Sequence, residues 1–109
     1  MDAYKKTHQA LCVYGELKRA RAAGGDDTRA FLAQVAAALS QLTTEEQIII
    51  QSIYIMQMTN EETAESADCD PSTVSRRKRR AIDRLTLYLY PDAYIQQRGL
   101  RVGALTDND

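Results

Sequence analysis

Hydrophobic residues follow a helical period over the first 41 residues of the chain. One series predicts a helix from about residue 3 to residue 22 and consists of Tyr4, Leu11, Tyr14 and Leu17. A second series predicts a helix from about residue 28 to residue 41 and consists of Phe31, Leu32, Val35 and Leu39. Gly24 and Gly25 are expected to end the first helix, and Asp26 or Asp27 to cap the second.

The apolar run at residues 48–56 is rich in β-branched side chains, which alone would favour a strand. A helix start signal precedes it, because Thr43 and Glu46 have the spacing of a capping box. Thr44 and Gln47 offer the same spacing. On a helical period the run also keeps one apolar face, made of Ile49, Ile50, Ile53 and Met56. A third helix is therefore predicted from about residue 42, with a buried strand as the alternative.

Two closely spaced helices are predicted next. Asn60 can cap a short acidic helix over residues 61–68, and Asp70 can cap a longer helix that starts at Pro71. The longer helix is expected to reach about residue 90, where Pro91 stops it. Helices joined this tightly must cross steeply, as in a helix-turn-helix. The predicted fold class is all-α, a small helical domain with a C-terminal helix-turn-helix and an N-terminal helical extension.

The residue types in this pair of helices fit a helix-turn-helix position by position. Ala64 is small where the second helix must cross, Cys69 can tuck under the turn, and Val74 can anchor the second helix. Ala67 is expected to pack inside, and Asp68 occupies the turn position where glycine is usual. The pattern therefore predicts which side of the second helix meets the core.

With Val74 pointing inward, a step of 100° per residue brings Ala81 and Leu85 to the same side. Lys78 falls on that side too, where its stem can cover apolar surface while its ammonium reaches water. The outward and flanking residues are hydroxyl-bearing or basic: Ser72, Thr73, Ser75, Arg76, Arg77, Arg79 and Arg80. Such a side is suited to a nucleic acid.

Charge is distributed very unevenly along the chain. Six of the 14 basic residues lie within residues 76–84, whereas residues 30–75 contain seven acidic residues and no Lys or Arg. The net charge is only −1, which favours one binding face for a polyanion such as DNA. A solvated charged face is the plain alternative. A membrane-surface helix is disfavoured, because Leu85, Leu87 and Leu89 do not form a broad apolar face.

Arginine offers a fork of donors to guanine, and Ser or Thr hydroxyls can reach bases or phosphates. Base contacts are predicted, with Arg76 the first candidate, for Ser72, Thr73, Ser75, Arg76 and Arg79. Phosphate contacts are predicted for Arg77, Lys78, Arg80 and Arg84.

Other chemistry is sparse. Cys12 and Cys69 lie far apart, and with a lone His8 they predict no metal site and no cofactor. Cys69 is expected in the core and His8 at the surface. The hydroxyl-bearing residues have no histidine nearby that could activate a nucleophile, so no enzyme is predicted. No signal peptide and no membrane span of ~20 apolar residues is visible, which predicts a cytoplasmic protein without membrane contact.

Residues 42–87 resemble region 4 of bacterial sigma-70-type factors. The resemblance is carried by Leu42-Thr43-Thr44-Glu45-Glu46, Tyr54, Glu62-Thr63-Ala64, Ser72-Thr73-Val74-Ser75-Arg76-Arg77, Ala81 and Leu85. It implies that the last helix reads a promoter element, and that residues 44–58 can face RNA polymerase. Thr63 stands where the family usually has isoleucine. The helical extension and the ending Tyr88-Leu89-Tyr90-Pro91-Asp92 resemble phage ArpU-type or RinA-type late-transcription regulators.

These features predict a sequence-specific double-stranded DNA-binding transcription regulator of phage or prophage origin. Its predicted parts are an N-terminal helical extension (1–41), a helix-turn-helix domain (42–91) and a flexible tail (92–109). The extension can pair in a homodimer or complete the core of its own chain, and both alternatives are open. The alternative functions are a DNA-packaging protein like a small terminase subunit and an RNA polymerase-binding, sigma-like accessory module.

Overall fold

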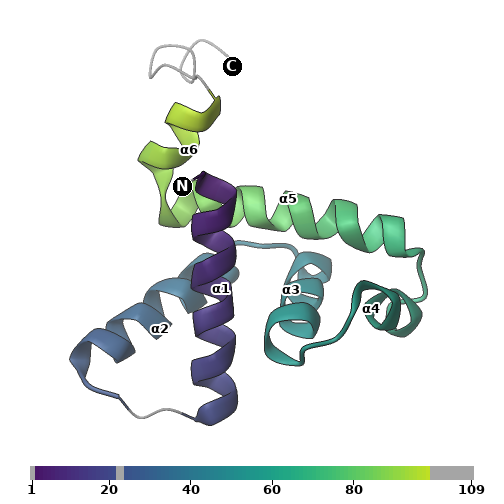
Figure 1. The fold of residues 1–109 in the computed structure, drawn as a ribbon, viewed down its shortest axis with the longest axis horizontal. Coiled ribbons are helices and arrows are strands. Elements are labelled where there is room, and N and C mark those ends of the chain that lie inside the picture. Colours follow the sequence, from purple (N-terminus) through teal and green to yellow (C-terminus); the bar gives the residue numbers. More distant parts are fainter. Residues whose placement is uncertain (1, 22–23, 99–109) are drawn as a thin grey trace.

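The computed structural model describes residues 2–21 and 24–98, and all regular structure in these ranges is helical. The helices are α1 (Ala3–Ala20), α2 (Asp26–Leu39), α3 (Thr44–Ile50), η1 (Gln51–Ile55), α4 (Asn60–Ser66), α5 (Pro71–Leu89) and α6 (Pro91–Arg98) (Figure 1). The short π-helix η1 continues α3 without a break. The all-α prediction is confirmed, and residues 48–55 are helical rather than a strand.

The long helix α5 is the element on which the others are assembled. It contacts α1, α2, α3, α4 and α6. In Figure 1, α3 and α4 lie along one side of α5, α1 crosses it near its C-terminal half, and α6 turns away at its end. The two ends of α5 therefore have different neighbours: α4 packs near its N-terminus, and α1 lies over its C-terminal turns.

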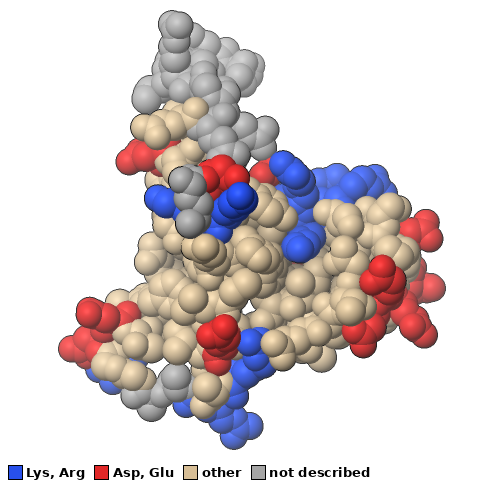
Figure 2. All heavy atoms as spheres, viewed as in Figure 1, with Lys and Arg blue, Asp and Glu red and all other residues tan. Residues whose placement is uncertain are grey.

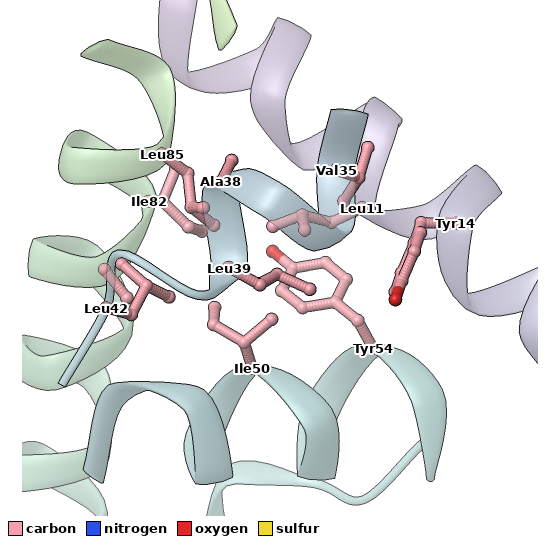
Figure 3. Packing of buried hydrophobic residues seen from close by; sticks show 11 residues of the cluster. Leu11, Tyr14, Val35, Ala38, Leu39, Leu42, Ile50, Tyr54, Ile82 and Leu85 are labelled. Carbon is pink, nitrogen blue, oxygen red and sulfur yellow. The ribbon is translucent and has the colours of Figure 1, made fainter. Parts of the chain in front are cut away.

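The core is shared between the N-terminal extension and the rest of the fold. Its largest cluster contains Leu11, Tyr14, Val35, Ala38, Leu39, Leu42, Ile50, Tyr54, Ala81, Ile82 and Leu85. Figure 3 shows Tyr54 of η1 and Ile50 of α3 pointing toward side chains of α1, α2 and α5. Helices α1 and α2 thus contribute apolar surface to the same core as α5, so the core crosses the predicted boundary at residue 42.

Two capping boxes fix the starts of α3 and α4. Thr43 and Glu46 form the first, which is one of the two predicted pairings. The second pairs Thr59 with Glu62, so the prediction that Asn60 caps this helix is wrong. The Thr59 hydroxyl accepts from the Glu62 amide, and the Glu62 carboxylate accepts from the Thr59 amide, which satisfies two otherwise unpaired donors.

The other helix boundaries differ from the predictions in ways that the backbone explains. Helix α1 ends at Ala20, before the glycines, because Arg21 adopts the left-handed conformation at φ 50°. Gly25 is the N-cap of α2, so Asp26 and Asp27 lie in the first helical turn instead of capping it.

The tail predicted from residue 92 begins with a helix instead. Pro91 ends α5, as predicted, but it also occupies the first position of α6, where proline needs no amide donor. Residues 99–109 of the predicted tail lie outside the described residues.

Helix α1 and η1 meet with almost no space between their backbones. A Cβ atom placed on Gly15 would lie 2.0 Å from the carbonyl oxygen of Tyr54. One turn later, Nη1 of Arg19 donates to the carbonyl oxygens of Tyr54 (2.7 Å) and Ile55 (3.1 Å). Carbonyls at a helix end lack intrahelical partners, so Arg19 caps the end of η1 from a neighbouring helix.

Thr63 gives a first testable consequence of the packing. It is 1% exposed, and its hydroxyl has no hydrogen-bond partner among the described residues. An unpaired buried hydroxyl costs about 1–2 kcal/mol, so Thr63→Val is expected to raise the free energy of unfolding by about 1 kcal/mol in urea titrations.

Thr86→Val is the matched control for this prediction. The Thr86 hydroxyl is buried but bonded, to the Thr7 hydroxyl (2.6 Å) and to the Ile82 carbonyl (2.7 Å). Its removal is expected to lower stability. A loss of stability in both variants would show that the Thr63 hydroxyl is satisfied in solution.

Candidate nucleic-acid interface

Helices α4 and α5 form the helix-turn-helix that the sequence predicts. Ala64 is 2% exposed and Val74 is fully buried, and both pack with Ile49 of α3 in a second small core cluster. Cys69 is half-buried against the same cluster. Ala67 is exposed, contrary to its prediction, because α4 already ends at Ser66 and Ala67 follows as its C-cap.

The turn between these helices needs one residue in the left-handed conformation, and Asp68 supplies it at φ 54°. Glycine has no steric penalty there, whereas Asp is one of the few other residue types that adopt this conformation with any frequency. A hydrogen bond from the Cys69 amide to the Ala64 carbonyl (2.9 Å) closes the turn. The departure from glycine therefore leaves the topology intact.

The orientation of α5 agrees with the prediction from sequence. Val74, Ala81 and Leu85 are fully buried, and Ile82 is buried with them. The opposite side carries the exposed residues Ser72, Ser75, Arg76, Arg79 and Arg80. Thr73 is half-buried at the edge between the two sides. One helix thus presents an apolar back to the core and a basic, hydroxyl-bearing front to solvent.

The front of α5 holds a shallow hollow lined by Ser75, Arg76, Arg79, Arg80 and Asp83. Figure 2 shows the basic side chains gathered along the edge of α5, with acidic side chains at the end where α4 lies. Nη2 of Arg76 donates to the Thr73 hydroxyl at 3.2 Å, and Nδ2 of the Asn60 side chain donates to the Ser75 hydroxyl at 3.2 Å. Neighbouring polar groups therefore orient three of the predicted base-reading side chains.

Two arginines that are predicted to contact phosphate form ion pairs within the chain. Nη1 of Arg84 lies 3.2 Å from Oε1 of Glu46, whose side chain is 6% exposed. Nη2 of Arg77 lies 3.6 Å from Oε2 of Glu45. The reason is tertiary, because the first turn of α3 packs against the middle of α5. Arg84 thus pairs with a buried carboxylate, and its contact with phosphate stays a prediction.

Among the other basic residues of α5, Lys78 and Arg79 lie over tyrosine rings, whereas Arg80 is exposed. The ammonium of Lys78 lies 5.7 Å from the centre of the Tyr54 ring, and the side chain is half-buried, as its inward direction predicts. The guanidinium of Arg79 lies 5.2 Å from the centre of the Tyr4 ring. Arg80 is exposed, and within the described residues no ion pair engages it. Arg80 is thus the best placed of the four predicted phosphate contacts.

His8, which is expected at the surface, is half-buried and has partners on both ring nitrogens. Its Nδ1 lies 2.7 Å from the Tyr54 hydroxyl, and its Nε2 lies 3.7 Å from Sγ of Cys12. Burial, with the charge of Lys78 as a second cause, lowers the pKa of His8. Burial also raises the pKa of Tyr54 well above its ordinary value. Of these three residues, Tyr54 also contacts α5, through the ammonium of Lys78, and no sequence motif marks the group.

The described residues also bear on metal binding and on membrane insertion. They contain no group of three His, Cys, Asp or Glu side chains with metal-binding geometry. None of their helices has the length and apolar composition needed to cross a bilayer.

Comparison with known protein families matches residues 38–86 to the model of sigma-70, region 4. The matched segment runs from the last turn of α2 to α5 and contains α3, η1 and α4. It is a sigma-70 region 4-like helix-turn-helix. No curated protein and no solved structure matches the chain.

Proposed function

We propose that this protein is a sequence-specific double-stranded DNA-binding transcription regulator that places the front of α5 in the major groove. One observation carries the proposal: a helix-turn-helix helix with a fully buried back presents Ser72, Ser75, Arg76, Arg79 and Arg80 to solvent. An α-helix fits the major groove, and arginine can read guanine with two hydrogen bonds. The likeness of residues 38–86 to sigma-70 region 4 supports the same reading.

The proposed contacts divide by position on α5. Arg76 is the first candidate for a base contact, followed by Arg79, Ser72, Thr73 and Ser75. Arg80 contacts phosphate, and the exposed N-terminal turn of α5 adds the Ser72 amide and a positive dipole end, since the Thr73 and Val74 amides donate to the Asp70 carbonyl. The internal contacts of Arg77, Lys78 and Arg84 reduce what these residues can contribute to phosphate binding.

The proposal includes a phage or prophage origin and a homodimeric assembly. The resemblance of the chain's ending to phage ArpU-type or RinA-type regulators supports a phage or prophage origin. A single helix-turn-helix makes few contacts and binds weakly, so a homodimer would raise its affinity. Light scattering separates this regulator from a packaging protein, because a monomer or dimer fits the first and a ring of eight or more subunits fits the second.

A second candidate function is an accessory module that binds RNA polymerase. Two exposed apolar side chains favour it: Ile48 of α3 is 50% exposed, and Met56, the C-cap of η1, is 66% exposed. This version predicts no stable complex of the isolated protein with any duplex, and a complex only when polymerase is present.

The test of the main proposal is a selection of bound fragments from random duplex DNA, followed by the variant Arg76→Ala. On the selected motif the variant is expected to lose about tenfold in affinity, close to 1.4 kcal/mol, and to lose discrimination at one base pair. Fluorescence anisotropy measures both effects.

Arg29→Ala is the matched control, since Arg29 is an exposed arginine of α2 that pairs with Asp26. It is expected to bind like the wild type. Unchanged affinity of Arg76→Ala would contradict the assigned orientation of α5, and no selected motif at all would contradict the function.

A further inference from the structure

The crossing of α1 over α5 is fixed by a buried pair of hydroxyls. The Thr7 and Thr86 oxygens lie 2.6 Å apart, and both residues are at most 2% exposed. Each hydroxyl also has a carbonyl of its own helix within reach, that of Ala3 for Thr7 (3.2 Å) and that of Ile82 for Thr86 (2.7 Å). Because each hydroxyl has one proton, one of them donates to the other, which in turn donates to the carbonyl of its own helix. A shift of one helix along the other would break this buried hydrogen bond between them, so the bond favours the observed crossing point.

One helical turn before Thr7, α1 carries Tyr4, and two turns before Thr86, α5 carries Arg79. Because Thr7 and Thr86 fix the crossing, Tyr4 comes to lie beside the front of α5. The guanidinium of Arg79 lies 5.2 Å from the centre of the Tyr4 ring, within the range of a cation–π contact. Burial raises the pKa of Tyr4, the Arg79 charge opposes that shift, and Asp83 adds to it.

We propose that Tyr4 of the N-terminal helix is a positioning residue for Arg79, and through it a determinant of DNA sequence specificity. The inference rests on the proposed function, and it extends the DNA-reading apparatus to a helix outside the matched residues 38–86. Arg79 lines the hollow on the front of α5. In the proposed complex a base edge lies at this hollow, so Tyr4 would hold the Arg79 guanidinium next to the base.

Preorganisation is the physical basis of this role. A free arginine side chain must lose much rotamer freedom when it binds, and a contact already present in the unbound protein reduces that cost. The cation–π contact uses the ring face and consumes none of the guanidinium N–H donors. Arg79 can therefore keep its place on Tyr4 and still donate to a base.

The test is a double-mutant cycle between Tyr4→Leu and Arg79→Ala, measured by anisotropy on the selected motif and on a scrambled duplex of equal length. Tyr4→Leu is expected to weaken binding to the motif about three- to tenfold and to change binding to the scrambled duplex little. Tyr4→Phe keeps the ring and is expected to stay within about twofold of the wild type. In the Arg79→Ala background, Tyr4→Leu is expected to add no further loss.

Tyr90→Leu is the matched control. The ammonium of Lys6 lies 5.3 Å from the Tyr90 ring, a contact of similar length between α1 and the residue that caps α5, but away from the hollow. Tyr90→Leu is expected to leave binding to both duplexes unchanged. Urea unfolding of each variant checks the fold, and Tyr4→Met replaces Tyr4→Leu if the leucine variant unfolds.

The outcomes separate the two proposals. If the wild type binds the motif but Tyr4→Leu loses nothing, the inference fails alone. It also fails alone if the loss persists in the Arg79→Ala background, or is equal on the scrambled duplex, because Tyr4 would then act through general stability. If the wild type binds no duplex, the proposed function fails and the inference falls with it.

Discussion

Gly15→Ala is expected to lower the free energy of unfolding by about 3 kcal/mol, although a glycine-to-alanine change inside a helix ordinarily raises stability by about 1 kcal/mol. The added Cβ would lie 2.0 Å from the Tyr54 carbonyl oxygen and 2.9 Å from its carbonyl carbon, and both are backbone atoms that cannot rotate away. Helix α1 must move off η1 to admit the methyl group. Urea unfolding monitored by circular dichroism measures the change.

Movement of α1 away from η1 would also break hydrogen bonds next to Gly15. Arg19 donates to the Tyr54 and Ile55 carbonyls from the next turn of α1, so separation of the helices removes the cap from η1. Gly25→Ala is the matched control, because a Cβ at Gly25 meets no atom within 4 Å. Its expected effect is below about 1 kcal/mol. Equal stability of Gly15→Ala and the wild type would show that α1 does not lie this close to η1.

The orientation of α5 could be derived from sequence because it depends on local geometry alone. Once Val74 is taken as the inward residue, the step of 100° per residue puts Ala81 and Leu85 beside it, and all three are fully buried. The capping box of Thr43 with Glu46 can be predicted from the sequence for the same reason, since its partners are three residues apart. Such relations need no knowledge of other helices.

The roles of the basic residues could not be derived in this way. Arg77 and Arg84 are paired with glutamates of α3 that lie 32 and 38 positions earlier in the chain. A count of charges along the sequence cannot show such pairs, because they exist only once α3 packs on α5. The step of 100° per residue predicts the correct side for Lys78, yet the neighbour of this residue, the Tyr54 ring, comes from η1.

Gly15, His8 and Pro91 illustrate three other limits. The need for glycine at position 15 depends on how closely the backbones of α1 and η1 approach each other. The hydrogen bond of His8 to the Tyr54 hydroxyl depends on a residue 46 positions away. Neither leaves a local pattern. Pro91 left an ambiguous one, because proline both ends a helix and favours the first position of the next. The tail predicted from residue 92 takes account of the first property only, whereas α6 begins at Pro91.

Arg84→Ala and Arg80→Ala are expected to have opposite consequences, although both remove an arginine from the same helix. Arg84→Ala leaves the Glu46 carboxylate buried without its partner, and one of its oxygens, Oε2, already has none. Removal of one member of a buried pair costs about 3–5 kcal/mol, and the partial exposure of Arg84 reduces the expected loss to about 2–3 kcal/mol. Arg80→Ala is expected to change stability by less than about 0.5 kcal/mol.

Binding to DNA should show the reverse pattern. Arg80→Ala is expected to weaken binding to all duplexes alike and to reduce the slope of log affinity against log salt by about 1, because one phosphate contact is lost. Arg84→Ala, measured where it remains folded, is expected to keep the wild-type slope.

A second substitution tests the cause of the Arg84 effect. In the Arg84→Ala background, Glu46→Gln removes the unpaired charge while keeping an oxygen that can accept from the Thr43 amide, so part of the lost stability is expected to return. If Arg84→Ala instead reduced the salt slope and left unfolding unchanged, Arg84 would be a phosphate contact after all. The front of α5 would then extend one turn further toward its C-terminus than the structure indicates.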